Sequence, residues 1–149
     1  IPAHRTLPLG CLKGGPSPGN EFHGSPVYKL PTYMKFGILI SSASLGIAEG
    51  MLEEYLEFIV GHTALMSGAA ASADPIQHLK VAEARVCLTA AGALARLTCN
   101  EMTAHVNAGT LPSDTERTRY RAHGAHIGRQ AWHVANLIWD AVMGRGVYE

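Results

Sequence analysis

The sequence predicts an all-α protein, a bundle of long antiparallel helices preceded by a segment rich in proline and glycine. Three observations support this fold class. Apolar residues recur every three or four positions along three stretches, the spacing that places side chains on one face of an α-helix. Six of the eight prolines lie in residues 1–32, where they interrupt any long helix or strand. Short connections with turn signals separate the stretches, so consecutive helices would pack as antiparallel neighbours.

The bulk composition is that of one globular domain. Of the 149 residues, 47% are hydrophobic and 16% are charged, which allows a sizeable core. Twelve basic and twelve acidic residues cancel, so the chain lacks the positive field that attracts nucleic acid. Polar residues interrupt the apolar runs before the ~20 residues of a membrane span, and no signal peptide opens the chain. We expect a cytoplasmic protein with no nucleic-acid or membrane partner.

The chain divides into a first segment, residues 1–32, and a helical domain, residues 33–149. Long loops without secondary structure are uncommon inside compact domains, so the first segment is predicted to be an interdomain linker in preference to a functional lid. The chain starts at Ile1 with no initiator methionine and stops abruptly at Glu149. We therefore expect a fragment of a longer protein.

The first predicted helix runs from about Tyr33 to His62. Gly46 and Gly50 lie one turn apart in its interior, where each glycine costs about 1 kcal/mol relative to alanine. We expect a neighbouring helix or a ligand to approach closely there. The apolar face of this helix is predicted to comprise Phe36, Leu39, Ile40, Ala43, Ile47, Met51, Leu52, Tyr55, Phe58 and Ile59.

The second predicted helix begins at Pro75 and ends near Asn107. Asp74 is a favourable N-cap, and proline suits the first helical position. The helix should bury an apolar stripe of Ile76, Leu79, Ala82, Val86, Ala90, Ala93, Leu94, Leu97 and Met102. Cys87 and Cys99 are too far apart in this helix to bridge each other, and we expect both to be buried free thiols.

The third predicted helix begins at Ser113 or Asp114 and ends near Met143. Glu116 is favourably placed in its first turn. Its buried face is predicted to include Ala125, Ile127, Ala131, Val134, Ala135, Ile138, Trp139 and Val142.

A polar stripe on the third helix is the main candidate for chemistry that the residue pattern offers. Histidines one turn apart can bind a divalent metal, but the zinc signature with a catalytic glutamate between two histidines is absent. We favour a solvated or subunit-facing edge and predict no metal site. The stripe comprises Arg119, His123, His126, Gln130, His133 and Asp140. Arg117, Arg119, Arg121 and Arg129 suit a phosphate, although an exposed face is again the favoured interpretation.

Three motifs in order resemble the C-terminal helical domain of the acyl-CoA dehydrogenase fold. They are LGIAEG at 45–50, DPIQ at 74–77 followed by AEA at 82–84, and MGRGVY at 143–148. The opening IPAHR resembles the end of the middle β domain of that fold. Gly144 and Tyr148 match the turn of the flavin-dependent two-component aromatic hydroxylases, so the chain is most similar to the oxygenase component of that group.

This resemblance implies a protein of about three domains. Residues 1–32 would then be the end of a β domain and its linker, and residues 33–149 an up-down four-helix bundle whose fourth helix is missing. The catalytic residues would lie outside the chain. The implied chemistry is hydroxylation of a small aromatic substrate with oxygen and reduced FMN or FAD, supplied by a separate flavin reductase. The implied assembly is a homo-oligomer, expected to be a tetramer.

The resemblance also implies contacts for individual residues. Gly144, Arg145 and Gly146, together with Ser42, are expected to bind the cofactor. Phe36 and Leu39 are expected to face the substrate. Two alternatives stay open, namely an acyl-CoA dehydrogenase with bound FAD and a non-catalytic helical oligomerisation module.

Overall fold

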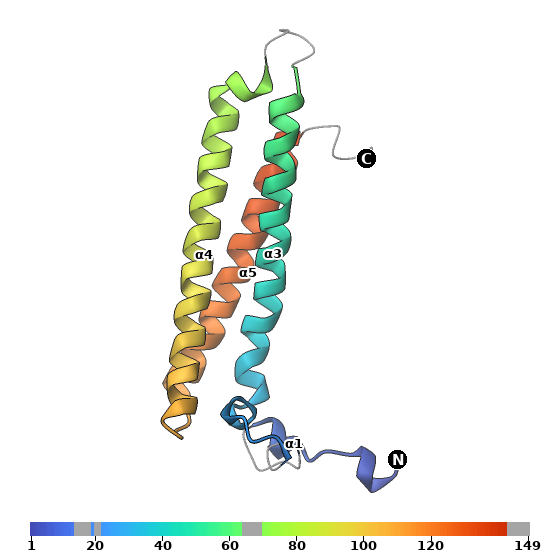
Figure 1. Ribbon diagram of the computed structural model, residues 1–149, viewed down its shortest axis with the longest axis vertical. Helices are drawn as coiled ribbons and strands as arrows, with labels where there is room; N and C mark the ends of the chain where they lie inside the picture. The colour runs from blue at the N-terminus through green and yellow to red at the C-terminus, as the bar shows by residue number, and fades with distance from the viewer. Residues whose placement is uncertain (14–18, 20–21, 64–69, 143–149) are drawn as a thin grey trace.

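Three long α-helices dominate the structure, which is a computed structural model that describes residues 1–13, 19, 22–63 and 70–142. They are α3 (Thr32–Gly61), α4 (Pro75–Asn107) and α5 (Asp114–Val142), and each starts within a residue of its predicted position. The three helices lie side by side and alternate in direction (Figure 1). The described residues contain no β-strand, only one isolated bridge between Thr63 and Ala70. The predicted all-α class is confirmed for this part of the chain.

The described residues before α3 include short helical turns, which lie at one end of the three long helices (Figure 1). These are η1 (Ala3–Arg5), α1 (Leu9–Leu12) and η2 (Pro26–Lys29). A further turn, η3 (Ala71–Ala73), precedes α4. The frequent prolines limit these elements to one turn each. The assignment of residues 1–32 to a linker and the end of a β domain stays a prediction.

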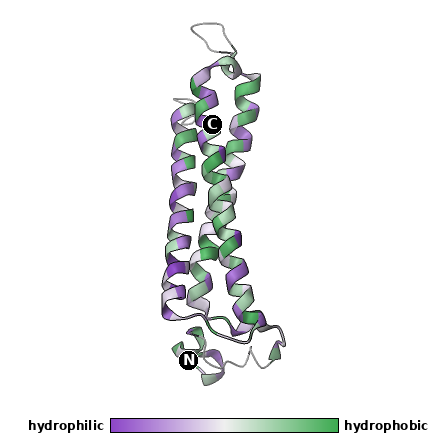
Figure 2. Ribbon diagram, turned by 90° about the vertical axis from the view of Figure 1, so that its left-hand side faces the viewer, coloured by the Kyte–Doolittle hydropathy of each residue, from purple (hydrophilic) through white to green (hydrophobic). Residues whose placement is uncertain are grey.

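The core is a seam of buried residues that are spaced alternately by three and four positions on α3 and α5. This heptad spacing keeps one face of each of these two helices toward its neighbours. On α4 the buried residues begin at Ala84 and follow the same face less regularly. Figure 2 shows that hydrophobic and hydrophilic residues alternate along all three helices. The buried seam comprises Met34, Ile38, Ser41, Leu45, Ala48, Leu52, Tyr55 and Ile59 on α3; Ala84, Leu88, Ala91, Thr98, Met102 and Val106 on α4; and Tyr120, Gly124, Ile127, Ala131, Val134, Ile138 and Ala141 on α5.

The predicted buried face is wrong for the first half of α3. Phe36 is 56% exposed and Ile47 is 66% exposed, whereas Ile38 and Leu45 are buried. Residues two positions apart lie about 200° apart around a helix, so the two sets occupy opposite faces. Both faces are apolar in this half, and periodicity cannot tell which of them turns inward. The prediction is confirmed in the second half, where Leu52, Tyr55 and Ile59 are buried.

The prediction for α4 is wrong by the same kind of rotation, whereas that for α5 is largely confirmed. Ile76, Leu79, Val86 and Leu97 of α4 are exposed, and Met102 is the predicted residue that is buried. On α5 the buried set includes the predicted Ile127, Ala131, Val134 and Ile138, while Ala125 and Trp139 are exposed. The α5 pattern is the clearest because polar residues occupy most of its outward positions.

Two further expectations need correction. Cys99 is exposed and not buried, and Cys87 is half-buried. By length and composition α3 is apolar enough to cross a membrane, contrary to the expectation that its apolar run is too short. A core helix passes the same test, and one face of α3 is indeed buried against α4 and α5. That the protein has no membrane partner stays a prediction.

The helix starts follow the predicted local signals. The Asp74 carboxylate accepts a hydrogen bond from the backbone N–H of Ile76 at 2.9 Å, as an N-cap does. At the start of α5, Ser113 Oγ accepts from the backbone N–H of Glu116 at 3.3 Å. The backbone N–H of Ser113 in turn donates to the Glu116 carboxylate at 2.7 Å. This reciprocal pair is a capping box, and it fixes where α5 begins.

Candidate functional site

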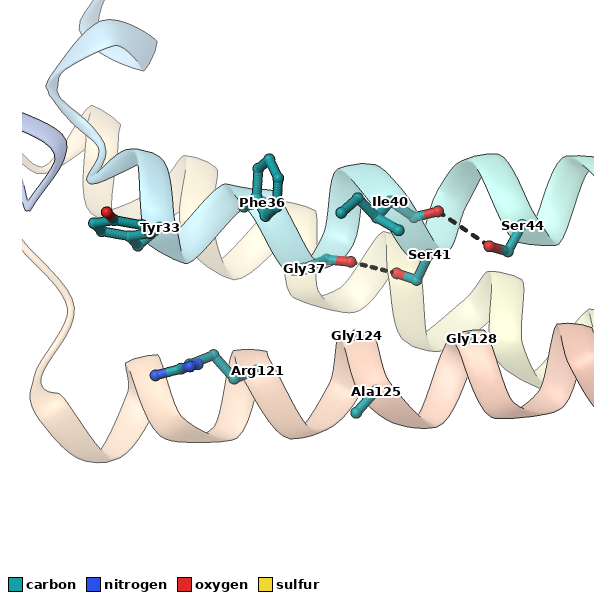
Figure 3. Close-up of a pocket in the computed structure, with 10 residues that line it drawn as sticks. All are labelled: Tyr33, Phe36, Gly37, Ile40, Ser41, Ser44, Arg121, Gly124, Ala125 and Gly128. Atoms are coloured by element: carbon teal, nitrogen blue, oxygen red, sulfur yellow. Dashed lines mark hydrogen bonds between the residues drawn. The ribbon is translucent and has the colours of Figure 1, made fainter.

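A groove of about 560 Å³ runs between the first halves of α3 and α5 (Figure 3). The groove has mostly apolar walls, and two aromatic rings belong to its lining. This is the size of a typical small-molecule site. The residues that line it are Tyr33, Phe36, Gly37, Ile40, Ser41 and Ser44 on α3, with Arg121, Gly124, Ala125 and Gly128 on α5.

Small residues let the backbones of α3 and α5 approach each other, and they leave the groove beside this contact unfilled by side chains. A Cβ atom built on Gly124 would lie 3.0 Å from the carbonyl carbon of Gly37 and 3.1 Å from its oxygen. No larger side chain fits at Gly124 without moving the α3 backbone. The expected approach at Gly46 and Gly50 is not seen, since a Cβ at either glycine would meet no atom within 4 Å among the described residues. The close contact of α3 is therefore at Gly37, one to two turns from its start.

The two serines of the groove use their hydroxyl protons locally. Ser41 Oγ donates to the Gly37 carbonyl at 2.8 Å, and Ser44 Oγ donates to the Ile40 carbonyl at 3.3 Å. Figure 3 shows both bonds along α3. Each hydroxyl oxygen keeps acceptor capacity toward the groove, so both serines can accept a hydrogen bond from a ligand.

Arg121 is the one charged residue in the groove lining, and it also borders a second cavity. This cavity, of about 160 Å³, is lined by Lys13, Pro31, Tyr33, Met34, Arg117 and Arg121, and we call it the cationic cavity. Tyr33 and Arg121 belong to both linings, so the two spaces adjoin. In Figure 3 these two side chains lie on facing sides of the gap between α3 and α5. An apolar space and a positively charged space therefore meet at this end of the helices.

The opposite side of α5 holds polar pairs with α4. Arg119 binds Glu101 at 2.7 Å, and His133 Nε2 lies 2.8 Å from a carboxylate oxygen of Glu83. Arg119, His123 and His133 of the predicted polar stripe therefore contact α4 and join the two helices. Among the described residues, no group of three or more histidine, cysteine, aspartate or glutamate side chains is placed to hold a metal ion.

The DPIQ motif has a structural role in this chain. The buried Tyr55 hydroxyl of α3 donates a hydrogen bond to the Gln77 side-chain oxygen of α4. Burial raises the pKa of Tyr55, and the nearby Asp74 carboxylate raises it further, so the phenol stays protonated as a donor. The motif thereby ties the start of α4 to the end of α3, far from the groove.

The predicted site residues fall in three places. Phe36 lines the groove. Leu39 and Ser42 lie on the same helix but are exposed and outside the groove lining. Gly144, Arg145 and Gly146 lie outside the described residues. Ligand contacts of all six residues stay predictions.

Sequence reasoning did not single out Tyr33, Gly124 or Arg121 as partners in one site. Arg121 belongs to an arginine cluster for which an exposed face was the favoured interpretation. The signal that distinguishes it is spacing, because Arg119 and Arg121 are two positions apart and so face opposite sides of α5. That spacing becomes informative only once the neighbours on both sides are known.

Comparison with known proteins places the chain in a family. The family model described as "Acyl-CoA dehydrogenase, C-terminal domain" matches residues 38–149, and the chain belongs to this family. Among curated proteins, it is similar to the "Flavin-dependent monooxygenase, oxygenase subunit HsaA" of Rhodococcus jostii (strain RHA1), with 30% identity over 92 residues. The match covers 61% of this chain and 24% of that protein, so the chain spans only a part of the relative's length.

Proposed function

We propose that the intact protein is a flavin-dependent monooxygenase that uses reduced FMN or FAD and oxygen to hydroxylate a small aromatic compound. The observation that carries this proposal is the groove between α3 and α5, with its apolar walls and the rings of Tyr33 and Phe36. Its volume lies within the range of about 300–1,000 Å³ for small-molecule sites. The similarity to a flavin-dependent oxygenase subunit supports the same class of reaction.

The residues of the groove would bind and orient the ring. Tyr33 and Phe36 offer aromatic faces and edges, and Ile40 and Ala125 add apolar surface. Ser41 and Ser44 offer acceptor oxygens for a phenolic hydroxyl. The rings of Tyr33 and Phe36 are about half exposed in the described part of the chain. In the intact protein the groove would have to be covered to exclude water, which protects a reactive oxygen species from unproductive breakdown.

A flavin would supply the activation of oxygen when bound. The described residues fit part of such a group. The apolar groove suits one edge of a planar ring, and Arg121 and Arg117 suit an anionic group. The predicted turn at Gly144–Gly146 would provide further contacts, so we assign no residue of the described part to the flavin ring itself.

The proposed assembly has three further parts. The relative is named an oxygenase subunit, which supports a separate reductase that supplies reduced flavin. A fourth helix completing an up-down bundle, and a homotetramer, are supported by apolar residues left exposed on all three helices, such as Ile47, Val86 and Trp132. We further propose a cytoplasmic location, where a flavin reductase would have its reduced nicotinamide donor at hand.

The test is oxygen consumption by the intact protein with 4-hydroxybenzoate or a neutral phenol. We expect consumption and a hydroxylated product only when a reductase or chemical reduction supplies reduced flavin. The second candidate, an acyl-CoA dehydrogenase, is favoured by the family model. Tightly bound FAD that is bleached by an acyl-CoA would establish that candidate and overturn the monooxygenase. If neither signal is observed, the remaining alternative is the non-catalytic oligomerisation module.

A pair of variants ties the activity to the groove. Phe36→Ala removes a ring from the lining, and Val60→Ala trims an exposed apolar side chain near the other end of the same helix. We expect Phe36→Ala to raise KM and to divert oxygen into hydrogen peroxide, while Val60→Ala leaves both unchanged. Equal effects of the two substitutions would place the substrate elsewhere.

A further inference from the structure

The groove and the cationic cavity adjoin, and their chemistry differs in a way that a single ligand can match. The groove offers rings and aliphatic surface, whereas the cationic cavity offers Lys13, Arg117 and Arg121. None of the described residues that line either space is acidic. Cationic side chains gathered without a carboxylate between them repel one another unless an anion joins them.

The two arginines are poorly paired within the described part of the chain. Arg121 forms no ion pair there. Arg117 meets only Asp114, with 3.5 Å between Nη1 and the carboxylate oxygen, and this aspartate side chain is 99% exposed. Arg117 Nε is buried and has no hydrogen-bond partner among the described residues. A buried donor without an acceptor costs stability, which an incoming oxyanion would recover.

Arginine is the cation best suited to such an anion. Its planar guanidinium donates two parallel hydrogen bonds to a carboxylate or a phosphate. Arg117 and Arg121 are four positions apart on α5 and therefore lie on the same face, one turn from each other. Tyr33 stands across from Arg121 and borders both spaces (Figure 3).

We infer that the groove and the cationic cavity form one site for an aromatic ligand that carries an oxyanion, with its ring in the groove and its oxyanion at Arg121 and Arg117. This inference rests on the proposed function where it concerns the substrate. The oxyanion has two possible sources, namely a carboxylate on the aromatic substrate or the phosphate of the flavin. Arg121 is then a specificity-determining residue, because it favours anionic over neutral ligands of the same shape.

The experiment measures binding to the intact protein by isothermal titration calorimetry at low ionic strength. Two matched pairs of probes separate the sources. The first pair is 4-hydroxybenzoate and its neutral counterpart 4-hydroxybenzamide, and the second is FMN and riboflavin. We expect the anionic member of one pair to bind about tenfold or more tighter than the neutral member. Tighter binding of the anion in the first pair would identify a substrate carboxylate, and tighter binding of the anion in the second pair would identify a flavin phosphate.

Substitutions then assign the preference to the arginines. Arg121→Gln should remove the preference for the anion, and Arg121→Lys should restore part of it because the charge returns without the planar fork. Arg129 is exposed like Arg121, but it lies two turns further along α5 and outside both linings. Arg129→Gln should therefore leave the preference for the anion unchanged. Unchanged thermal unfolding of Arg121→Gln would exclude a loss of fold as the cause.

The inference is overturned if neither anionic probe binds tighter than its neutral counterpart, or if Arg121→Gln keeps the full preference. These results are independent of turnover. Hydroxylation of a neutral phenol without any preference for an anion would refute the site and leave the proposed function standing. A preference for an anion without flavin-dependent oxygen consumption would refute the function and leave the site standing.

Discussion

The two sides of α5 differ in how they hold the neighbouring helix. Toward α4, side chains form specific polar contacts, such as Arg119 with Glu101 and His133 with Glu83. Toward α3, backbone approaches backbone at Gly124 and Gly37, and the groove opens beside this contact. On the α4 side, polar residues of α5 have partners within the chain. On the α3 side, Arg121 has no ion pair and the rings of Tyr33 and Phe36 have no ring contact among the described residues.

This difference teaches where to look for function in a bundle whose helices resemble one another. Polar residues that already have partners on a neighbouring helix fix the register and have less capacity left for a ligand. Polar and aromatic residues beside a close glycine contact keep their capacity to bind a ligand. The histidines of α5, which carry the strongest chemical signal in the sequence, lie mainly on the closed side.

The largest effect is expected from Gly124→Ala on the α3 side. The new Cβ would lie 3.0 Å from a backbone atom of Gly37, which cannot rotate away as a side chain would. Overpacking of this kind costs about 1–3 kcal/mol of unfolding free energy, measured by urea unfolding of the intact protein. Gly128→Ala is the matched control, because its Cβ would lie 3.9 Å from Ser41 Cβ, an ordinary contact. A loss at Gly128 as large as at Gly124 would contradict the close backbone contact.

A smaller loss is expected from Thr98→Val on the α4 side. The fully buried Thr98 hydroxyl donates to the Leu94 carbonyl at 2.8 Å and lies 2.8 Å from His123 Nδ1. Because the hydroxyl has a single proton, His123 Nδ1–H is the donor in the second bond. Valine keeps the shape and leaves that donor unpaired, at a cost of about 1–2 kcal/mol.

The control for Thr98 is Thr103, which is exposed on the same helix. Its hydroxyl makes the same kind of bond to a carbonyl four positions back, that of Cys99 at 2.8 Å. Thr103→Val should change the unfolding free energy by less than about 0.5 kcal/mol. If the two valine variants unfold alike, the bond between α4 and α5 contributes no stability.

The capping box of α5 predicts a dependence of stability on pH. The Ser113 hydroxyl and its backbone N–H donate to Glu116, His105 contributes less, and together they lower the pKa of Glu116 from 4.5 to about 2. A lowered pKa in the folded state means that the ionised carboxylate stabilises the fold above about pH 4.5. That contribution disappears as the pH falls from about 4.5 to about 2. Thermal unfolding at several pH values should show this loss.

Glu116→Gln tests the assignment, because its amide does not titrate. The variant should be less stable than the natural protein at pH 7, and the difference should shrink toward pH 2. A difference that stays constant over this range would mean that another group causes the acid dependence.

The smallest effect is expected from Arg119→Gln. The pair with Glu101 is short, at 2.7 Å, but both side chains are partly exposed. Ion pairs in such positions contribute about 0–1 kcal/mol, and added salt screens them. Urea unfolding at low and high salt should show a difference that is small and disappears in high salt. A loss above about 2 kcal/mol would mean that the pair is shielded from solvent.

Local signals predicted the helices well and their orientation poorly. The cap at Asp74, the proline at Pro75 and the capping box at Ser113 and Glu116 act within one turn, so the sequence contains all that they need. The inward face of α3 depends on which of two apolar faces meets α5. That choice is a property of the packed helices, and it could not be read from periodicity.

The candidate site was predictable only in part for the same reason. The resemblance led to the expectation that Phe36 and Leu39 face the substrate. Phe36 lines the groove and Leu39 does not, and the ligand contact of each stays a prediction. The pairing of Tyr33 with Arg121 brings together residues far apart in the chain. Their proximity depends on the close contact of α3 and α5 at Gly124. Nothing in the sequence distinguishes Gly124 from the other glycines of the helices.

The most direct test of the account compares the two arginines that lie two positions apart on α5. The measurement is the dissociation constant of the anionic probe, 4-hydroxybenzoate or FMN, that the natural protein prefers over its neutral counterpart. It is determined for Arg121→Gln and Arg119→Gln, each relative to the natural protein. We expect Arg121→Gln to weaken binding about tenfold or more, while Arg119→Gln, which loses its contacts with Glu101 and the Tyr120 ring, binds as the natural protein does. Equal binding by the two variants would contradict the assignment of the α3 side of α5 to a ligand.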